Sequence, residues 1–358
     1  MANTKMLRPN VGIYVATADA FADWKAPTLT EITAATKVFN ISPAVTDDYT
    51  LNMTDSQADT SLSIVDNADV QTPTYNNYEA SLDLFRDANL SATSVFNKAL
   101  DLFKAADVKY YLIKRVGKTH EAAFAAGDEV SVYGVRTDFP IDIVGDAEMV
   151  RLGARFLTTG EVAVNVTVGA GTAGTGPALA ATIGTKMVSN YKIRVDWVDS
   201  ADVTDEEAFI SAPSAAIIAG GVDLTNAIAW DSYDLGTQDS NKIDDRGIVD
   251  EGQVQTRGFA QYTGSLMFFR DADPDATSDY NTAYDTFKAA TDGSKPQGYL
   301  VTRIGVAATA AHAEDQIVSV FKFIADAFMD NTEGEDSVKF MVNFAPQGKL
   351  GVNVTVAA

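Results

Sequence analysis

The 358-residue chain contains no cysteine, which excludes disulfide frameworks, thiolate metal sites and cysteine nucleophiles. Histidine is nearly as scarce, and His120 and His312 form neither a catalytic triad nor a zinc site. We interpret both as ordinary loop residues. No apolar run approaches the roughly 20 residues that span a bilayer, and residues 1–10 lack the apolar region of a secretory signal. We therefore expect cytoplasmic synthesis without export, and no membrane partner.

Basic side chains are also in short supply. The chain has 27 Lys and Arg against 49 Asp and Glu, a net charge of −22. Residues 1–168 carry 14 basic and 22 acidic side chains (−8), and residues 169–358 carry 13 and 27 (−14). Acid spread in this way opposes attractive contacts with phosphate, so a protein that grips nucleic acid is not expected. A protein that lets DNA pass without holding it is compatible with this charge.

The chain repeats itself. Residues 81–106 read SLDLFRDANLSATSVFNKALDLFKAA and residues 265–290 read SLMFFRDADPDATSDYNTAYDTFKAA, displaced by 184. After a slip of four residues, YLIKRVG at 111–117 answers to YLVTRIG at 299–305. Further matches in the same order relate 70–72 to 254–256, 130–133 to 318–321, 160–168 to 348–356 and, weakly, 10–15 to 190–195. A common order over most of the chain indicates a tandem duplication.

Each copy contains the pattern of one helix among several strands. Leu82 and Leu84 alternate with Ser81 and Asp83, as in a half-buried strand. An amphipathic helix follows, with apolar residues at i, i+3, i+4 and i+7: Phe96, Ala99, Leu100 and Phe103, then Tyr280, Ala283, Tyr284 and Phe287. Strands are predicted at 110–116, 129–135, 150–157 and 162–168. The fold class is therefore α+β, mainly β: two tandem β-sandwich domains, each with one flanking helix.

The domain boundaries follow from the repeat. We expect copy 1 at residues 1–168, a Gly-rich linker at 169–186 and copy 2 at 187–358. Residues 169–174 (GAGTAG) fit the GxGxxG dinucleotide pattern, but no βαβ alternation surrounds them. We interpret them as part of the linker and expect no cofactor.

Two other local patterns have simpler interpretations. The acidic run Asp271, Asp273, Asp275 and Asp279 suggests calcium, but Ala276 and Thr282 stand where an EF-hand needs Gly and Glu. Helix capping by polar residues is favoured, and calcium stays open as an alternative. The glycosylation sequons at Asn165 and Asn353 lie inside predicted strands and are discounted. No catalytic constellation is present, so we expect no enzyme.

Two long polar segments, residues 41–62 and 231–246, are predicted to be loops. Loops of this length inside a compact domain are usually functional or disordered. Their aromatic residues lie among acids and would suit contact with another subunit, while a merely solvated loop stays an equal alternative. The candidate contact residues are Asp47, Asp48, Tyr49, Asp55, Asp59, Tyr233, Asp239, Asp244 and Asp245.

Taken together, these segments resemble a known family. PTLTEI (27–32) and PSAAII (213–218) precede strands, and FRDA, FKAA and YLIKRVG or YLVTRIG follow in both copies. The pattern resembles the major tail tube proteins of long, non-contractile-tailed phages (siphophages). The resemblance implies a structural virion protein, assembled in the host cytoplasm, whose inner strands join neighbours in a ring-shaped β-barrel. Rings would stack through the long loop and terminal arms into the conduit for DNA ejection. Implied partners are the tape measure, tail terminator and distal tail proteins.

The resemblance also predicts a subunit count. Members of the family usually carry one such domain and form hexameric rings, so a duplicated chain suggests a trimeric, pseudo-hexameric ring. Asp83, which alternates away from Leu82 and Leu84, is our first candidate for a lumen-facing residue, with an intersubunit or helix-facing position as alternatives. The rival function is a tandem β-sandwich binding module, an adhesin or carbohydrate binder. That rival would predict an export signal and clustered tryptophans, whereas the chain has only Trp24, Trp197 and Trp230.

Overall fold

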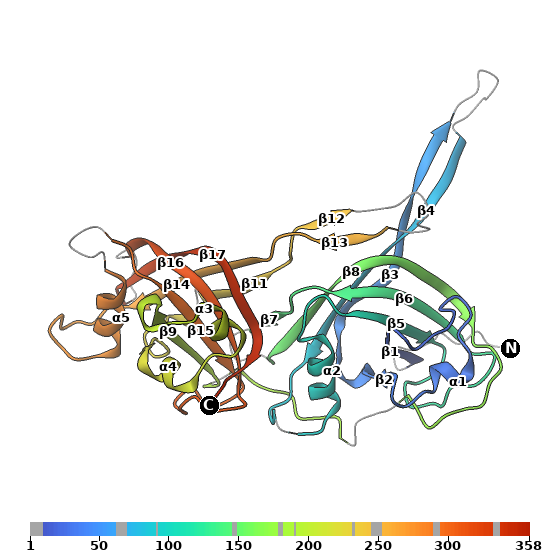
Figure 1. Cartoon of the computed structure of the whole chain (residues 1–358), viewed down its shortest axis with the longest axis horizontal. Coiled ribbons are helices and arrows are strands. Elements are labelled where there is room, and N and C mark those ends of the chain that lie inside the picture. Colours follow the sequence, from blue (N-terminus) through green and yellow to red (C-terminus); the bar gives the residue numbers. More distant parts are fainter. Residues whose placement is uncertain are drawn as a thin grey trace. The chain divides into compact units, whose positions relative to one another are not determined.

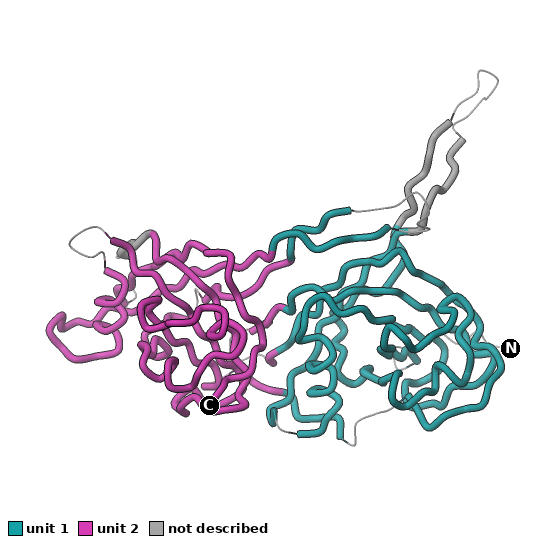
Figure 2. Tube along the Cα trace, viewed as in Figure 1, with its two compact units in different colours: residues 1–140, 151–186, 240–259 teal, residues 141–150, 187–239, 260–358 magenta. Residues whose placement is uncertain are grey.

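The computed structural model describes residues 10–61, 70–90, 92–144, 149–177, 182–189, 191–230, 233–244, 253–288, 294–331 and 337–358 (Figure 1). Two compact units make up the chain (Figure 2). Unit 1 contains residues 1–140, 151–186 and 240–259; unit 2 contains residues 141–150, 187–239 and 260–358. Each unit thus includes a short segment that the repeat assigns to the other copy. The linear boundaries at 168 and 187 stay a prediction.

Unit 1 is built on one antiparallel sheet with the strand order β2-β1-β5-β6-β8-β4-β3. Its strands are β1 (Val11–Thr17), β2 (Val38–Asn40), β3 (Val45–Ser61), β4 (Val70–Phe85), β5 (Lys109–Val116), β6 (Glu129–Thr137) and β8 (Arg151–Thr167). Two helices accompany it, α1 (Leu29–Ile32) and α2 (Val95–Phe103).

Unit 2 repeats this order, as β10-β9-β15-β16-β17-β14-β11. The strands are β9 (Ile193–Asp199), β10 (Val222–Asp223), β11 (Asp234–Gln238), β14 (Gln261–Phe269), β15 (Gln297–Ile304), β16 (Ile317–Asn331) and β17 (Lys339–Thr355). Its helices are α3 (Glu206–Ser211), α4 (Ala215–Gly220) and α5 (Asp279–Phe287). Strands take 49% of the chain and helices 14%, so the predicted mainly-β class with two tandem domains is confirmed.

The longest strands bend each sheet into a half-barrel. Residues 151–155 of β8 pair with β4, whereas residues 156–167 pair with β6. In unit 2, β17 likewise pairs with both β14 and β16. Our two predicted strands at 150–157 and 162–168 are therefore one strand. Gly160, at φ 78°, sits among register shifts between β6 and β8, and such bulges increase the local bend.

The duplication extends to unusual backbone conformations. Positive φ recurs at positions 188 residues apart: Gly117 and Gly305, Gly160 and Gly348, Asn165 and Asn353. The sequon asparagines thus occupy left-handed positions within β8 and β17. Pairing also corrects our weak alignment of residues 10–15 with 190–195. Arg115 lies opposite Gly12 and Arg303 opposite Arg194, so the first strands are related by 182 residues and not by 180.

The predicted helices are present and capped as expected. Ser94 Oγ accepts a hydrogen bond from the Asn97 N–H (3.2 Å) at the start of α2. Ser278 Oγ accepts one from Asn281 (3.2 Å) in α5. The apolar stripe of α2 is buried, including Phe96 and Phe103, and Phe103 meets Phe156 of the sheet edge-to-face at 5.3 Å. The stripe therefore holds the helix against the core.

The two predicted long loops are wrong. Residues 45–61 form β3, which pairs with β4 up to Ser61 and Val70, and the 231–246 segment contains β11 and β12 (Lys242–Asp244). β8 pairs with β4 only over residues 81–85. The rest of β3 and β4 therefore form a two-stranded hairpin that extends beyond the sheet (Figure 1). Residues 54–60 of β3 are polar apart from Ala58, so they lack the apolar alternation by which strands are recognised.

Candidate assembly surfaces

The β3–β4 hairpin is the most extended surface of unit 1. Val45 pairs with Leu84 but the next pair is Tyr49 with Leu82, so three residues bulge opposite one. Two candidate residues, Asp47 and Asp48, lie exposed in this bulge, and Tyr49 is half-buried at its end. The hairpin candidates Asp55 and Asp59 belong to β3, but their side chains lie outside the described part. The bulge therefore presents acid beside a strand pair that extends from the sheet.

Asp83, the lumen candidate, lies opposite this bulge in β4 and is only 6% exposed. Its Oδ1 is 2.9 Å from Arg155 Nη1, and its Oδ2 is 4.0 Å from Arg151 Nη1. Asp83 pairs with Gly153 on β8, and the missing side chain there leaves room for the Arg155 guanidinium. Within unit 1 the carboxylate is thus paired and largely screened from solvent. Its position relative to a lumen stays a prediction.

Residues 240–259 come from copy 2 but pack on unit 1 (Figure 2). They contain β12 and its partner β13 (Gln255–Arg257). Ser240 Oγ donates to the buried carboxylate of Asp138 at 2.6 Å, and Val254 forms a β-bridge with Thr159 of β8. The Arg257 guanidinium lies 4.6 Å from the Phe139 ring centroid. Residues 240–259 are therefore an integral part of unit 1.

The structure places the predicted contact residues Asp239, Asp244 and Asp245 in different surroundings. Asp244 accepts a hydrogen bond from Gln253 Nε2 at 2.8 Å, whereas Asp239 is exposed at the end of unit 2. Asp245 lies outside the described residues. Sequence reasoning missed Ser240 and Asp138, because no local pattern indicates a contact over 102 residues.

The converse exchange occurs in unit 2, where residues 141–150 come from copy 1. They include β7 (Ile141–Ile143), which contacts β11. Tyr233 lies beside this segment and stacks on Trp230 with ring centroids 5.8 Å apart. Burial, with the carboxylates of Asp142 and Asp234 nearby, raises the pKa of Tyr233 well above its ordinary value. Tyr233 thus belongs to the surface that receives a segment of the other copy.

Comparison with known families shows which family of proteins the chain is a member of. Two segments, residues 1–171 and 180–358, each match the family described as phage tail tube protein. The chain belongs to this family. Two successive matches confirm the internal duplication and the tail tube resemblance, and no curated protein sequence matches the chain. This tail tube protein is therefore a structural component of the phage tail that assembles with itself into a tube.

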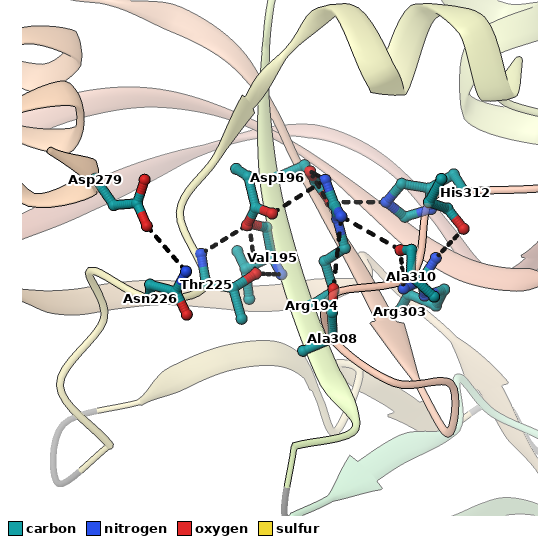
Figure 3. A network of polar contacts seen from close by, with 12 residues as sticks. Arg194, Val195, Asp196, Thr225, Asn226, Asp279, Arg303, Ala308, Ala310 and His312 are labelled. Atoms are coloured by element: carbon teal, nitrogen blue, oxygen red, sulfur yellow. Dashed lines mark hydrogen bonds and ion pairs between the residues drawn. The ribbon is translucent and has the colours of Figure 1, made fainter. Parts of the chain in front are cut away.

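A buried polar network anchors one loop of the tail tube protein in unit 2 (Figure 3). Asp196 Oδ2 lies 2.7 Å from His312 Nε2, and Arg194 Nη2 lies 2.8 Å from Asp196 Oδ1. Burial opposes ionisation, but the hydrogen bonds from His312 and Arg194 outweigh it and lower the pKa of Asp196. Arg303 is fully buried and donates to the Ala310 and Ala311 carbonyls at 2.7 and 2.9 Å.

The network holds residues 310–312 of this loop in place. His312 does lie in a loop, as expected, but it is buried and paired, which the sequence did not indicate. His120 is half-buried, and its carbonyl accepts from the Tyr14 hydroxyl at 3.2 Å. No group of three His, Asp or Glu suited to a metal occurs among the described residues. In that same part of the chain, no helix is long and apolar enough to span a membrane.

The acidic run of the tail tube protein acts as a series of turns. Asp271 Oδ1 accepts from the Asp273 N–H at 2.9 Å, and Asp273 Oδ1 from the Asp275 N–H at 3.1 Å. A hydrogen bond with Ser278, and others from backbone amides, lower the pKa of Asp271. Asp279 accepts from Asn226 Nδ2 at 2.9 Å. These carboxylates are therefore used by the turn that leads into α5.

The Gly-rich segment after β8 lies along α1. The Thr172 N–H donates to Thr30 Oγ1 at 2.9 Å, and the Gly174 N–H donates to Thr33 Oγ1 at 2.7 Å. A Cβ at Gly174 would lie 2.4 Å from the Thr33 carbonyl oxygen. The glycines thus permit close approach to a helix of unit 1, which a freely moving linker would not require.

Unit 2 contains a cleft of about 600 Å³. Tyr191, Ile193, Val195, Ile228 and Trp230 supply most of its apolar wall. Among the described residues that line it there is no carboxylate, histidine or lysine. Of the side chains that acid–base catalysis uses, the described lining contains the tyrosines Tyr191 and Tyr233.

Proposed function

We propose that this tail tube protein forms stacked rings, each of three chains, whose bore is the conduit for DNA ejection in a siphophage. The observation that carries the proposal is the exchange of segments 141–150 and 240–259 between the two copies. A contact that joins one copy to the next is heterologous, and repeating it around an axis closes a ring. With two copies in each chain, half of these contacts are intramolecular and gain from high effective concentration.

The β3–β4 hairpin is proposed to join successive rings. In the part of the chain that is described, residues 51–61 of β3 and residues 70–80 of β4 pair only with each other. Exposed strand edges readily accept further pairing, and natural proteins cover or close them. The exposed Asp47 and Asp48, with the half-buried Tyr49, would lie at the base of this contact. The tape measure, terminator and distal tail proteins are the further proposed partners, with assembly in the host cytoplasm.

Electron microscopy and mass measurement test the assembly. We expect negatively stained preparations to show tubes or rings, and native mass spectrometry of isolated rings to give three chains. Because each chain carries two copies of the domain, three chains supply six positions around the axis. Six chains in a ring would contradict the pseudo-hexamer, and discrete single particles at all concentrations would favour the binding-module alternative.

Assembled tubes are expected not to bind duplex DNA measurably. Three chains carry a net charge of −66 (3 × −22), and each Lys or Arg contact in a bore would add a site at which DNA is retained. A bore lined by Asp and Glu would repel DNA only mildly, because salt screens the charges over about 8–10 Å at physiological ionic strength. Fluorescence anisotropy with a labelled duplex should stay unchanged between about 50 and about 200 mM salt. Tight, salt-sensitive binding, or a bore lined by basic residues, would contradict this proposal.

A further inference from the structure

Residues 182–186, which we call the strap, lie along unit 1 just before the chain enters unit 2. Backbone groups hold the strap in place. The Ala88 N–H donates to the Thr185 carbonyl at 2.7 Å, and the Val95 N–H donates to the Thr182 carbonyl at 2.9 Å. The Lys186 ammonium lies 3.8 Å from the Phe85 ring centroid. The strap therefore fills the space between the end of β4 and the first turn of α2.

The surface beneath the strap is closed to solvent. Asp87, Ser94 and Phe96 are each 1–2% exposed, and Asp87 Oδ1 accepts a hydrogen bond from the Thr185 N–H at 3.3 Å. The chain continues into Met187, whose carbonyl accepts from the Val150 N–H at 2.9 Å. Both Met187 and Val150 are 0% exposed.

Unit 2 has the counterpart of this surface, and no strap covers it among the residues that the structure describes. We call it the α5 face: Phe269, Asp271, Ser278, Tyr280 and Val338, the repeat counterparts of Phe85, Asp87, Ser94, Phe96 and Val150. Tyr280 is 36% exposed where Phe96 is 2%, and Val338 is 49% exposed where Val150 is 0%. Asp271 and Ser278 are half-buried. Two large apolar side chains of copy 2 are thus open where their counterparts in copy 1 are covered.

The chain contains a second version of the strap sequence. Thr4-Lys5-Met6-Leu7 repeats Thr185-Lys186-Met187-Val188 at a displacement of 181. The strands that follow, β1 and β9, are displaced by 182, so both versions precede the first strand of their copy at nearly the same distance. Asn3 stands in place of Gly184, which has φ 113°. Asparagine is among the residues that adopt positive φ most readily.

We infer that residues 4–7 of a second copy of this chain dock on the α5 face, as the strap and Met187 dock in the first half of the chain. The strap joins the first strand of copy 2 to the surface of the copy before it. Residues 4–7 precede the first strand of copy 1, so the copy before them is copy 2 of another chain. Lys5 would lie over Phe269, Met6 against Val338, and the backbone of Thr4 beside Asp271. This inference rests on the proposed ring.

Disulfide trapping tests the docking, because the chain has no cysteine of its own. Met149 and Val188 form an antiparallel bridge, a spacing that suits a disulfide. Their counterparts in the proposed contact are Ser337 and Leu7. Oxidising the double variant Leu7→Cys, Ser337→Cys should link chains into a ladder on a non-reducing gel. The control pair Met149→Cys, Val188→Cys should form a link within one chain.

Mixing experiments separate the outcomes. Chains with only Leu7→Cys, assembled with chains that have only Ser337→Cys, should give linked dimers and nothing larger. A fast-migrating, internally linked monomer from the double variant would overturn docking by a second copy. Normal tubes without any link, while the control pair does link, would overturn the inference and leave the proposed function intact. Failure of the unmodified protein to form rings or tubes would overturn the proposed function itself.

Discussion

Shortening the β3–β4 hairpin is expected to leave the tail tube protein folded but unable to form tubes. The change replaces residues 55–76 with an Asn-Gly turn that joins Thr54 to its strand partner Asn77. Such a turn matches the twist of paired strands. Loss of about 3 kcal/mol of contact per chain would raise the concentration needed for assembly roughly a hundredfold. Analytical ultracentrifugation and negative-stain microscopy measure this change.

The structure explains why the shortened protein should fold. Tyr78 is 1% exposed, donates its hydroxyl to the Gly134 carbonyl and accepts from the Thr159 N–H at 3.0 Å. This anchor stays in place, as do the pairs of residues 81–85 with β8. Cutting residues 47–59 would remove the buried Leu51 and leave residues 72–80 of β4 without a strand partner. Tubes of normal length from the shortened protein, with unchanged circular dichroism, would show that the hairpin is only solvated surface.

The periodicity of apolar residues was enough to predict the helices and several strands from the sequence. The stripe through Phe96, Leu100 and Phe103 predicted α2, and the strand expected at 129–135 is β6. Periodicity failed where burial does not alternate. The β3–β4 hairpin has polar residues on both faces, and Gly160 gave the impression of a turn between two strands although β8 continues through it. Burial on one face is the physical origin of the signal, and residues 54–60 of β3, which are polar apart from Ala58, give none.

Contacts distant in the sequence could not be predicted from either copy alone. Exchange of segments 141–150 and 240–259 depends on where each copy meets the next, and no residue pattern encodes that position. The pairing of His312 with Asp196 spans 116 residues. Comparison of the two copies explains this pairing, because unit 1 has other residue types at the same two positions.

The two units surround an equivalent buried arginine in different ways. In unit 1, Arg115 lies 4.1 Å from the Phe124 ring centroid and 3.5 Å from Asp128 Oδ2, and Phe124 also meets Tyr14. A Cβ at Gly12 would lie 2.6 Å from the Tyr14 hydroxyl oxygen, so glycine is required beside the ring. The counterparts of Gly12, Tyr14, Phe124 and Asp128 in unit 2 are Arg194, Asp196, His312 and Gln316.

Asp196→Ala is therefore expected to destabilise unit 2 by about 3–5 kcal/mol, because Arg194 and Arg303 would lose their buried counter-charge and His312 its hydrogen-bond partner. Denaturant titration followed by the fluorescence of the buried Trp197 measures the loss. The penalty should depend on pH, since the pKa of Asp196 is lowered from 3.8. Its stabilising contribution is complete above that ordinary value and disappears as the pH falls through the lowered one. The two proteins should thus converge in stability on acidification below about pH 4.

A matched control transplants the unit 1 arrangement. The quadruple variant Arg194→Gly, Asp196→Tyr, His312→Phe, Gln316→Asp moves the counter-charge of Arg303 to the position that Asp128 has beside Arg115. Because a complete replacement of a buried ionic set by a packed one is often nearly neutral, we expect a stability within about 1 kcal/mol of the original protein. Omitting Arg194→Gly should restore the penalty, since a Cβ there would strike the tyrosine ring. Equal stability of Asp196→Ala and the original protein at neutral pH would show that the network contributes nothing.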